Sequence, residues 1–286
     1  MSFLVRSEGL LYRPGMPSLE ENEAVWGHDY QWQSGGDEWS AMWGGPTMQW
    51  YGAIFPRIRA FLPSTRILEI APGHGRWTAF LLDHCDDLLG VDLSENCIDV
   101  CRERFADLPK ASFFVNDGTS LPMAHDNSVD FVFSFDSLVH VEIDVLQSYM
   151  DEFARILTKD GAAFFHHSNN GADTSVRAVD RYGKVVAERL PALTPVLKRA
   201  GVLDPYAWRA LSVSAPLVEK LASDAGLRCV GQEVINWSGR SLTDCISLIC
   251  RPGSRWDRQN VVAINPDFGS EARSLNKAQK AFGFET

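Results

Sequence analysis

From about residue 64 the chain alternates short apolar runs with amphipathic stretches, and glycine or polar residues separate them. Five of the apolar runs have the length and the β-branched and aromatic content of buried strands. These runs are residues 66–71, 87–94, 111–118, 128–137 and 161–170. Stretches with apolar residues at helical spacing lie between them, at 77–85, 95–108 and 145–161. Strands joined by short helical crossovers predict an α/β protein with a doubly wound, mostly parallel sheet.

Two more strands follow the first five. Residues 216–237 predict a helix, a glycine stop and a strand, and residues 243–252 predict a last strand, which makes the sheet seven-stranded. Residues 171–212 between these parts have a helical, moderately basic pattern, and we expect them to form a lid over the carboxyl edge of the sheet.

The ends of the chain differ from this core, which spans residues 64–252. Residues 1–63 are rich in tryptophan without a strand pattern, and we interpret them as an N-terminal cap. Residues 253–286 are polar, and we expect a loosely ordered C-terminal tail.

Charge and composition narrow the classes of partner. A net charge of −10 argues against nucleic acid or an acidic membrane, because both need a basic face. No stretch has the apolar length of a membrane span, and the first residues lack the apolar run of a signal peptide. The six cysteines form no CxxC pair, which is typical of buried thiols in a reducing compartment. We therefore expect a cytoplasmic protein with a small-molecule substrate, and its oligomeric state is left open.

A loop with two glycines, Gly73 and Gly75, follows the first strand. No lysine follows Gly75, so the loop is not a phosphate-binding P-loop. The dinucleotide fingerprint needs a third glycine for close packing of helix on strand, and Trp77 cannot take that role. Glu69, at the end of the strand, would repel a pyrophosphate but suits a cofactor that carries an ammonium and a sulfonium.

Acidic residues also end the second and third strands. Asp92 lies 19 residues after Gly73, where a carboxylate accepts the two hydroxyl groups of a ribose. Asp117 precedes Gly118, where it is placed to contact an adenine. Each acid alone also fits a turn or a salt bridge. Their common position at the carboxyl edge of one sheet favours a site for a nucleoside without phosphates.

These motifs, over residues 64–168, resemble the core of class I S-adenosylmethionine-dependent methyltransferases. The resemblance implies the Rossmann-like methyltransferase fold and S-adenosyl-L-methionine as the cofactor. By position, it places cofactor contacts at Glu69, Ala71, Gly73, Gly75, Asp92, Leu93, Asp117, Gly118 and Phe135. Ala71 stands where the family has its first glycine, and we expect a negative φ there because alanine tolerates it.

Methyl transfer to a hydroxyl needs a group that removes its proton. His140, on the loop after the fourth strand, is the preferred base, with His167 and Asp136 as further catalytic candidates. His166, on the opposite face of its strand from His167, is interpreted as a packing residue, and His74 as a loop residue near the cofactor. A bound magnesium ion is also possible, with Asp136, His140 or His167, and Asp244 with Asn236 as its ligands. No spacing among these residues requires a metal.

The acceptor is predicted from the segment at 233–247, which places Asn236, Trp237, Arg240 and Asp244 beside the site. An indole platform with amides suits a sugar ring. The segment, with the Trp-Gly-Gly run at 43–45, resembles bacterial sugar and polysaccharide O-methyltransferases, of which one group acts on methylmannose polysaccharide precursors. The expected enzyme is an O-methyltransferase acting on a sugar or oligosaccharide. Methylation of a small amine, a nicotinamide-dependent oxidoreductase and a non-catalytic cofactor-binding protein are the alternatives.

Overall fold

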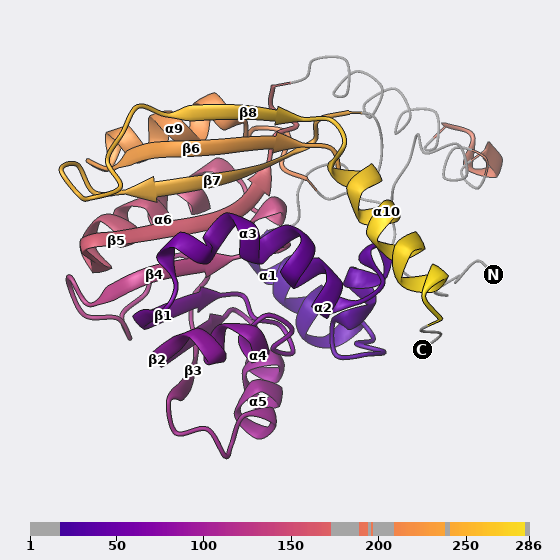
Figure 1. The fold of residues 1–286 in the computed structure, drawn as a ribbon, viewed down its shortest axis with the longest axis horizontal. Coiled ribbons are helices and arrows are strands. Elements are labelled where there is room, and N and C mark those ends of the chain that lie inside the picture. The colour runs from indigo at the N-terminus through magenta and orange to yellow at the C-terminus, as the bar shows by residue number, and fades with distance from the viewer. Residues whose placement is uncertain (1–17, 173–188, 194–195, 197–208, 238–240, 284–286) are drawn as a thin grey trace.

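An eight-stranded sheet forms the centre of the molecule in the computed structural model (Figure 1). The structure describes residues 18–172, 189–193, 196, 209–237 and 241–283. The strand order is β3-β2-β1-β4-β5-β7-β6-β8. The strands are β1 (Ser64–Ile70), β2 (Cys85–Asp92), β3 (Ala111–Val115), β4 (Val129–Ser134), β5 (Leu157–Ser168), β6 (Arg228–Ile235), β7 (Asp244–Cys250) and β8 (Val261–Asn265).

The doubly wound arrangement predicted from the alternating pattern is confirmed. All neighbouring strands pair in parallel except β7, which is antiparallel to both β5 and β6. The chain winds in one direction from β1 to β3 and in the other from β4 onward, so β1 and β4 flank the point where the strand order reverses. Ligands of open α/β sheets bind at this point, outside the carboxyl ends of the strands.

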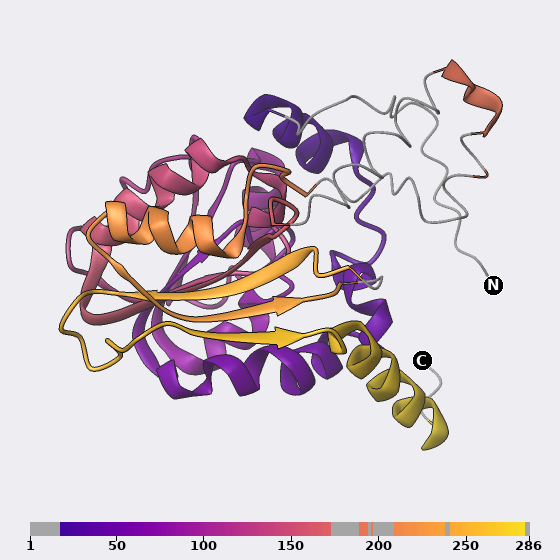
Figure 2. The ribbon, with the colours of Figure 1, turned by 90° about the horizontal axis from the view of Figure 1, so that it is seen from above.

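Helices cover both faces of the sheet, as Figure 2 shows from above. On one face lie α6 (Ile143–Ile156) and α9 (Ala215–Asp224). The buried residues of α6 recur at spacings of three and four, which gives one apolar stripe against β4 and β5. The other face is covered by α2 (Pro46–Gln49), α3 (Phe55–Ile58), α4 (Thr78–Leu81) and α5 (Glu95–Arg104). Each face therefore has its own hydrophobic core.

Short helices make up the described part of the N-terminal segment. They are α1 (Leu19–Ala24), η1 (Val25–Asp29), η2 (Asp37–Trp43), α2, η3 (Trp50–Ile54), α3 and η4 (Arg59–Phe61). Three further short helices lie later in the chain: η5 (Leu82–His84), η6 (Leu138–His140) and η7 (Pro191–Leu193). Trp43 and Trp50 are fully buried in the core beneath them. A capping box begins α1, because Ser18 and Glu21 each bond to the other's backbone N–H.

The expectation of a loosely ordered tail is wrong for residues 261–281. These residues form β8, which pairs with β6, and the helix α10 (Phe268–Ala281), which packs against η2 and α2. Phe268 and Ala272 anchor α10 in the core of the N-terminal helices. Residues 261–264, which are Val-Val-Ala-Ile, do carry a strand signal, but the polar residues around them outweighed it in the prediction. In α10 only Phe268, Gly269 and Ala272 are buried, so most of this helix is polar and at least partly exposed. The sheet therefore has eight strands and not seven.

Most of the expected lid at 171–212 lies outside the described residues. In the part of the chain that the model describes, no helix has the length and apolar content needed to cross a membrane.

Candidate functional site

A pocket opens at the carboxyl edge of the sheet, where the loops after β1, β2 and β4 meet the N-terminal helices. It offers about 180 Å³ to water-sized molecules. Its walls combine aromatic rings with a few charged groups, which is the usual make-up of a small-molecule site. Of the predicted cofactor contacts, its lining includes Ala71, Gly73, Asp92, Leu93, Gly118 and Phe135.

The glycine loop reaches the pocket in a left-handed backbone conformation. The φ angles are +57° at Gly73 and +80° at Gly75, as expected for glycines in a tight turn. Ala71 has a φ of +56°, so the expectation of a negative φ there is wrong. Ser137 donates a hydrogen bond to the Ala71 carbonyl, which ties the strained residue to the loop after β4. Gly75 packs against Phe105 and does not line the pocket.

Asp92 ends β2 and lines the pocket. Its Oδ2 accepts a hydrogen bond from the Gly73 N–H at 3.0 Å, and its Oδ1 accepts one from the Ser94 N–H at 2.9 Å. Burial raises the pKa of Asp92 to about 6, although these backbone hydrogen bonds partly offset the effect. Each carboxylate oxygen keeps capacity to accept a further hydrogen bond from a ligand hydroxyl.

Glu69 lies one layer below the pocket and not in its wall. Thr78 donates a hydrogen bond to Oε2 at 2.5 Å, and Oε1 has no hydrogen-bond partner. Burial raises the pKa of Glu69 to about 8, so its carboxyl group is protonated at neutral pH. The Glu69 carboxyl group, which the sequence predicted to face a cationic cofactor, is therefore neutral in the unliganded protein.

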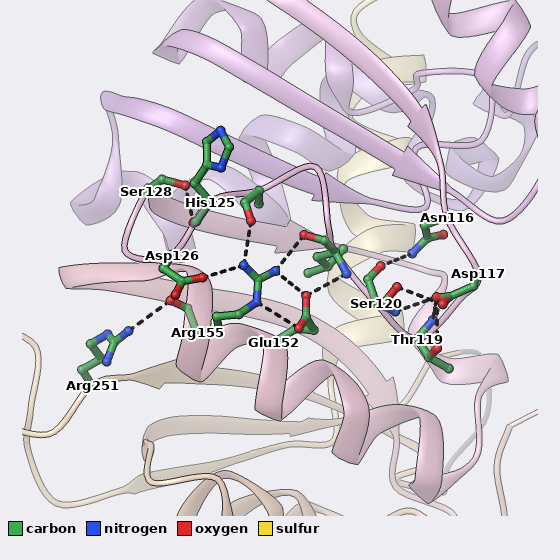
Figure 3. A network of polar contacts seen from close by, with 12 residues as sticks. Asn116, Asp117, Thr119, Ser120, His125, Asp126, Ser128, Glu152, Arg155 and Arg251 are labelled. Carbon is green, nitrogen blue, oxygen red and sulfur yellow. Dashed lines mark hydrogen bonds and ion pairs between the residues drawn. The ribbon is translucent and has the colours of Figure 1, made fainter.

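Asp117 does not line the pocket. Its carboxylate accepts hydrogen bonds from the backbone N–H and the hydroxyl groups of Thr119 and Ser120, and so stabilises the turn after β3 (Figure 3). Burial raises its pKa, but these bonds together outweigh burial and lower it. The neighbouring Asn116 and Gly118 face the pocket instead. Asn116 is held by the Ser120 carbonyl at 3.2 Å and the Tyr149 hydroxyl at 3.3 Å.

The loop after β4 places Phe135 and Asp136 in the pocket wall. Asp136 has a φ of +70° and pairs with Arg76, whose guanidinium lies 2.8 Å from its Oδ2. Arg76 also stacks on the ring of Trp77 and donates to the Ser40 hydroxyl. Burial raises the pKa of Asp136, but the contacts with His166 and Arg76 outweigh it and lower the pKa.

His166, which the sequence analysis assigned to packing, is fully buried and does not line the pocket. Its ring lies between the rings of Phe135, at 4.8 Å, and Trp237, at 5.1 Å. Nε2 is 3.1 Å from Asp244 Oδ2, and Nδ1 is 3.3 Å from Asp136 Oδ1, although this second contact lacks the alignment of a hydrogen bond. The alternation of side chains along a strand predicts that His166 and His167 lie on opposite faces of the sheet, but it does not indicate which face is next to the pocket.

His167 lies on the other face of β5, away from the pocket. Its ring nitrogens contact the Ser168 carbonyl at 2.8 Å and the Ser247 hydroxyl at 2.7 Å. Burial lowers its pKa to about 4. The structure therefore places this catalytic candidate in the core, where no acceptor can reach it.

His140 ends η6 and lines the pocket. Its ring lies 5.4 Å from the ring of Trp26, and its carbonyl accepts a hydrogen bond from Asn22. Both partners belong to the N-terminal helices. Of the three predicted catalytic residues, His140 and Asp136 are thus in the pocket wall and His167 is not.

Further tryptophans of the N-terminal segment cover the glycine loop. Trp32 stacks on His74 with ring centroids 4.3 Å apart, and a Cβ at Gly73 would meet the Trp32 ring at 2.8 Å. Burial lowers the pKa of His74. Trp26 and Trp39 also line the pocket, so part of the predicted cap is a wall of the site.

The residues that the sequence analysis placed beside the site in the segment at 233–247 have different positions in the structure. Trp237 lines the pocket, while Asp244 lies behind it and receives two hydrogen bonds at 2.7 Å from Arg209. Asn236 accepts a hydrogen bond from the Gly269 N–H and orients the start of α10. Arg240 lies outside the described residues. Among the residues that the model describes, no group of three or more His, Cys, Asp or Glu side chains is arranged to hold a metal.

Residues 67–161 match the family model described as "Methyltransferase domain". The chain is 30% identical over 184 residues to the biotin biosynthesis bifunctional protein BioHC of Cellvibrio japonicus, a match that covers 62% of this chain. It spans only 31% of the length of that protein.

A solved methyltransferase structure shows the same architecture. A SAM-dependent methyltransferase from Methanosarcina mazei superimposes with a TM-score of 0.50 at 18% identity, covering 69% of this chain and 98% of the other. The N-methyltransferase NodS from Bradyrhizobium japonicum, in complex with S-adenosyl-L-homocysteine, gives a TM-score of 0.46 at 16% identity, covering 69% and 85%. The strand order, the residues matched by the family model and the Methanosarcina structure together identify a methyltransferase domain with the class I methyltransferase fold in this chain.

Proposed function

We propose that this protein transfers the methyl group of S-adenosyl-L-methionine to a hydroxyl group of a small molecule, with a sugar or oligosaccharide as the acceptor. The observation that carries the proposal is the position of Asp92, in the wall of a pocket at the reversal point of a sheet whose residues 67–161 match a methyltransferase domain. The name of the matched Cellvibrio protein, which refers to biotin biosynthesis, agrees with a small acceptor.

The pocket residues fit this cofactor. Asp92 would hold the ribose hydroxyls, since both of its oxygens are already oriented by backbone N–H groups. Leu19, Leu93 and Val141 add aliphatic surface to the pocket wall, and Leu19 and Leu93 lie against Gly118, which would suit the apolar face of a purine. The bound cofactor supplies a methyl group on a positively charged sulfur, so the chain itself must position the acceptor and remove its proton.

His140 is the residue that fits the role of base. It lies in the pocket wall on the loop after β4, and a neutral imidazole nitrogen can accept the proton of a hydroxyl group. Asp136 fits this role less well, because its carboxylate is paired with Arg76 and its pKa is low. We propose that Asp136 orients Arg76 and His166 and that His140 takes the hydroxyl proton.

Trp237 supports a sugar acceptor. Its ring lines the pocket and is held in place by stacking on His166 and Phe268. A fixed indole presents an apolar face for the C–H groups of a sugar ring while polar groups contact the hydroxyls. An amine acceptor would need a carboxylate free to bind its ammonium group, but the carboxylates of Asp136 and Glu142 are already engaged, with Arg76 and with Ser212.

The test is transfer of labelled methyl from S-adenosylmethionine to a panel of monosaccharides, oligosaccharides, phenols and small amines, with and without a chelator. Label on a saccharide hydroxyl would support the proposal, and label on an amine would support N-methylation instead. Binding of S-adenosylhomocysteine by calorimetry separates a failure of cofactor binding from a wrong acceptor panel. A loss of transfer in the chelator arm would reveal a metal requirement.

A further inference from the structure

Residues 22–32, from α1 to the loop after η1, lie along the pocket, and Asn22, Trp26 and Trp32 belong to its lining. We call residues 22–32 the bridging segment, because its two ends contact loops that follow different strands. At one end Trp32 stacks on His74 of the glycine loop after β1, with ring centroids 4.3 Å apart. At the other end Asn22 contacts the loop after β4.

The middle of the bridging segment docks at the start of α5, next to Asp92. A Cβ at Gly27 would meet the hydroxyl oxygen of Ser94 at 2.7 Å, which leaves no room for a side chain unless Ser94 moves. The Gly27 carbonyl accepts a hydrogen bond from the Asn96 side chain at 2.6 Å. Ser94 in turn donates its backbone N–H to Asp92, the proposed ribose ligand. The bridging segment is therefore fixed against the side of the pocket that we assign to the cofactor.

Asn22 connects the bridging segment to His140 in two ways. Its side chain is buried, and its Nδ2 donates a hydrogen bond to the His140 carbonyl at 3.3 Å. Its Oδ1 accepts a hydrogen bond from the indole N–H of Trp26, also at 3.3 Å. The Trp26 ring packs on the His140 ring, with centroids 5.4 Å apart and 32° between the ring planes. One buried amide thus holds both the backbone of His140 and the indole against which its imidazole packs.

The position of His140 within its own element makes these contacts important. His140 is the last residue of η6, a helix of three residues, so the helix itself restrains the side chain little. A base must lie within hydrogen-bond distance of the proton that it removes. A displacement of about 1 Å can lower a rate about 100-fold. Contacts that fix the imidazole are therefore expected to affect turnover more than binding.

We propose that Asn22 and Trp26 are positioning residues, which hold the imidazole of His140 where it takes the proton of the acceptor. This inference rests on the proposed function, which assigns the role of base to His140. Asn22 and Trp26 act through His140, by fixing its backbone and its ring. Because the same segment docks beside Asp92, the base is held in place by an element that also borders the cofactor side of the pocket.

The test is a double-mutant cycle in kcat, measured with labelled S-adenosylmethionine and the most active acceptor of the panel described above. Asn22→Ala should lower kcat at least tenfold and change KM less than threefold. In the His140→Ala background the same substitution should lower kcat less than twofold, because no base is left to position. A tenfold loss in both backgrounds would show a merely structural role and would overturn the inference.

Two further variants complete the cycle. Trp26→Phe, which keeps an aromatic ring against His140, should retain more activity than Trp26→Ala, and Trp26→Ala replaces Asn22→Ala in the cycle if the latter fails to fold. The matched control is Asn276→Ala. It breaks the same kind of bond, from a side-chain amide to the Ala41 carbonyl at 2.8 Å, but outside the pocket, and should leave kcat within twofold.

An NMR measurement separates this inference from the proposed function, since it needs no acceptor. The histidine ring signals of the protein loaded with S-adenosylhomocysteine are recorded, and the ring current of Trp26 should displace the signal of His140. Asn22→Ala and Trp26→Ala should move that signal and leave the signal of the exposed His125 unchanged. A His140 signal that moves in neither variant would contradict the inference.

The two measurements together identify which hypothesis fails. If no acceptor is methylated but the His140 signal moves in both variants, the positioning of His140 stands and the reaction is misassigned. If an acceptor is methylated and only His140→Ala loses activity, while Asn22→Ala and Trp26→Ala turn over normally, the reaction stands and the positioning role is wrong.

Discussion

His166 and Asp244 form an ion pair in which neither side chain has exposed surface, with Nε2 3.1 Å from Oδ2. The pair joins β5 to the antiparallel strand β7, directly behind the pocket. Breaking such a pair leaves an uncompensated buried charge, so the state of His166 matters for the stability of the fold as well as for the pocket.

The first prediction concerns the pH dependence of stability through His166. Its pKa in the folded protein is raised above the unfolded value of 6.5 by Asp136 and Asp244, which outweigh burial. The resulting stabilisation is fully present below about pH 6.5 and is lost as the pH rises through the folded pKa. The free energy of unfolding should fall on the alkaline side more steeply in the wild type than in His166→Asn. His125→Asn, at an exposed histidine, is the control and should retain the wild-type slope.

Glu69 should affect stability over a different range of pH. Burial raises its pKa from 4.5 to about 8, so the folded protein holds a proton that the unfolded chain releases. Stability is therefore lost progressively between those two values, and the full loss is present above pH 8. Urea unfolding should show Glu69→Gln more stable, relative to wild type, at pH 9 than at pH 5, by more than about 1 kcal/mol. The same difference at both pH values would show that the carboxyl group is already ionised.

Asp92→Ala should weaken binding of S-adenosylhomocysteine at least tenfold, since a carboxylate that accepts hydrogen bonds from ligand hydroxyls contributes about 1.5–3 kcal/mol. The carboxylate also orients the Gly73 and Ser94 backbone, so Asp92→Asn serves as the matched variant that keeps one acceptor oxygen. Calorimetry measures both affinities. Unaltered binding in both variants would remove Asp92 from the cofactor site.

His140→Ala should lower kcat about 100-fold or more while changing the affinity for S-adenosylhomocysteine less than threefold. The expectation follows from the position of His140, which lies in the pocket wall on the loop after β4, whereas Asp92 lies at the end of β2. The wild-type rate should rise with pH through the titration of one group, and the variant should lose that rise. Normal turnover in the variant would show that another group, or solvent, removes the proton.

Ala71→Gly should stabilise the protein by about 1 kcal/mol, because an L-residue in the left-handed region is strained by about 1–2 kcal/mol. Ala79→Gly is the comparison. Ala79 is exposed in α4, where glycine should destabilise by about 0.5–1 kcal/mol. Thermal or urea unfolding measures both. A destabilised Ala71→Gly would mean that the methyl group of Ala71 contributes packing that exceeds the strain.

The sequence predicted the sheet well because hydrophobic periodicity is a local property. The apolar runs at 66–71, 87–94 and 128–137 coincide with most of β1, β2 and β4, and the short crossovers between the predicted strands indicated a parallel sheet. The edge strand β8 was missed although residues 261–264 form an apolar and mostly β-branched run, because the tail was interpreted from its overall polar composition.

The site was predicted less completely, because side-chain direction depends on tertiary contacts. Asp117 has the position of a ligand residue in the sequence, but Thr119 and Ser120 direct its carboxylate into a turn. His166 and His167 are adjacent and equivalent in the sequence, and only the pairing of β5 with β7 places Asp244 beside His166. Arg76 and Arg209 are 133 positions apart in the sequence. Only the folded structure shows that both take part in ion pairs beside the pocket, Arg76 with Asp136 and Arg209 with Asp244.

The aromatic wall of the pocket has an optical consequence. Of the eight tryptophans that the structure describes, five line the pocket: Trp26, Trp32, Trp39, Trp77 and Trp237. Indole emission responds to a change of polarity or to stacking against its ring, and here the rings are concentrated where a ligand must enter. The protein thus carries its own fluorescent reporters, and occupancy of the pocket can be followed without a label.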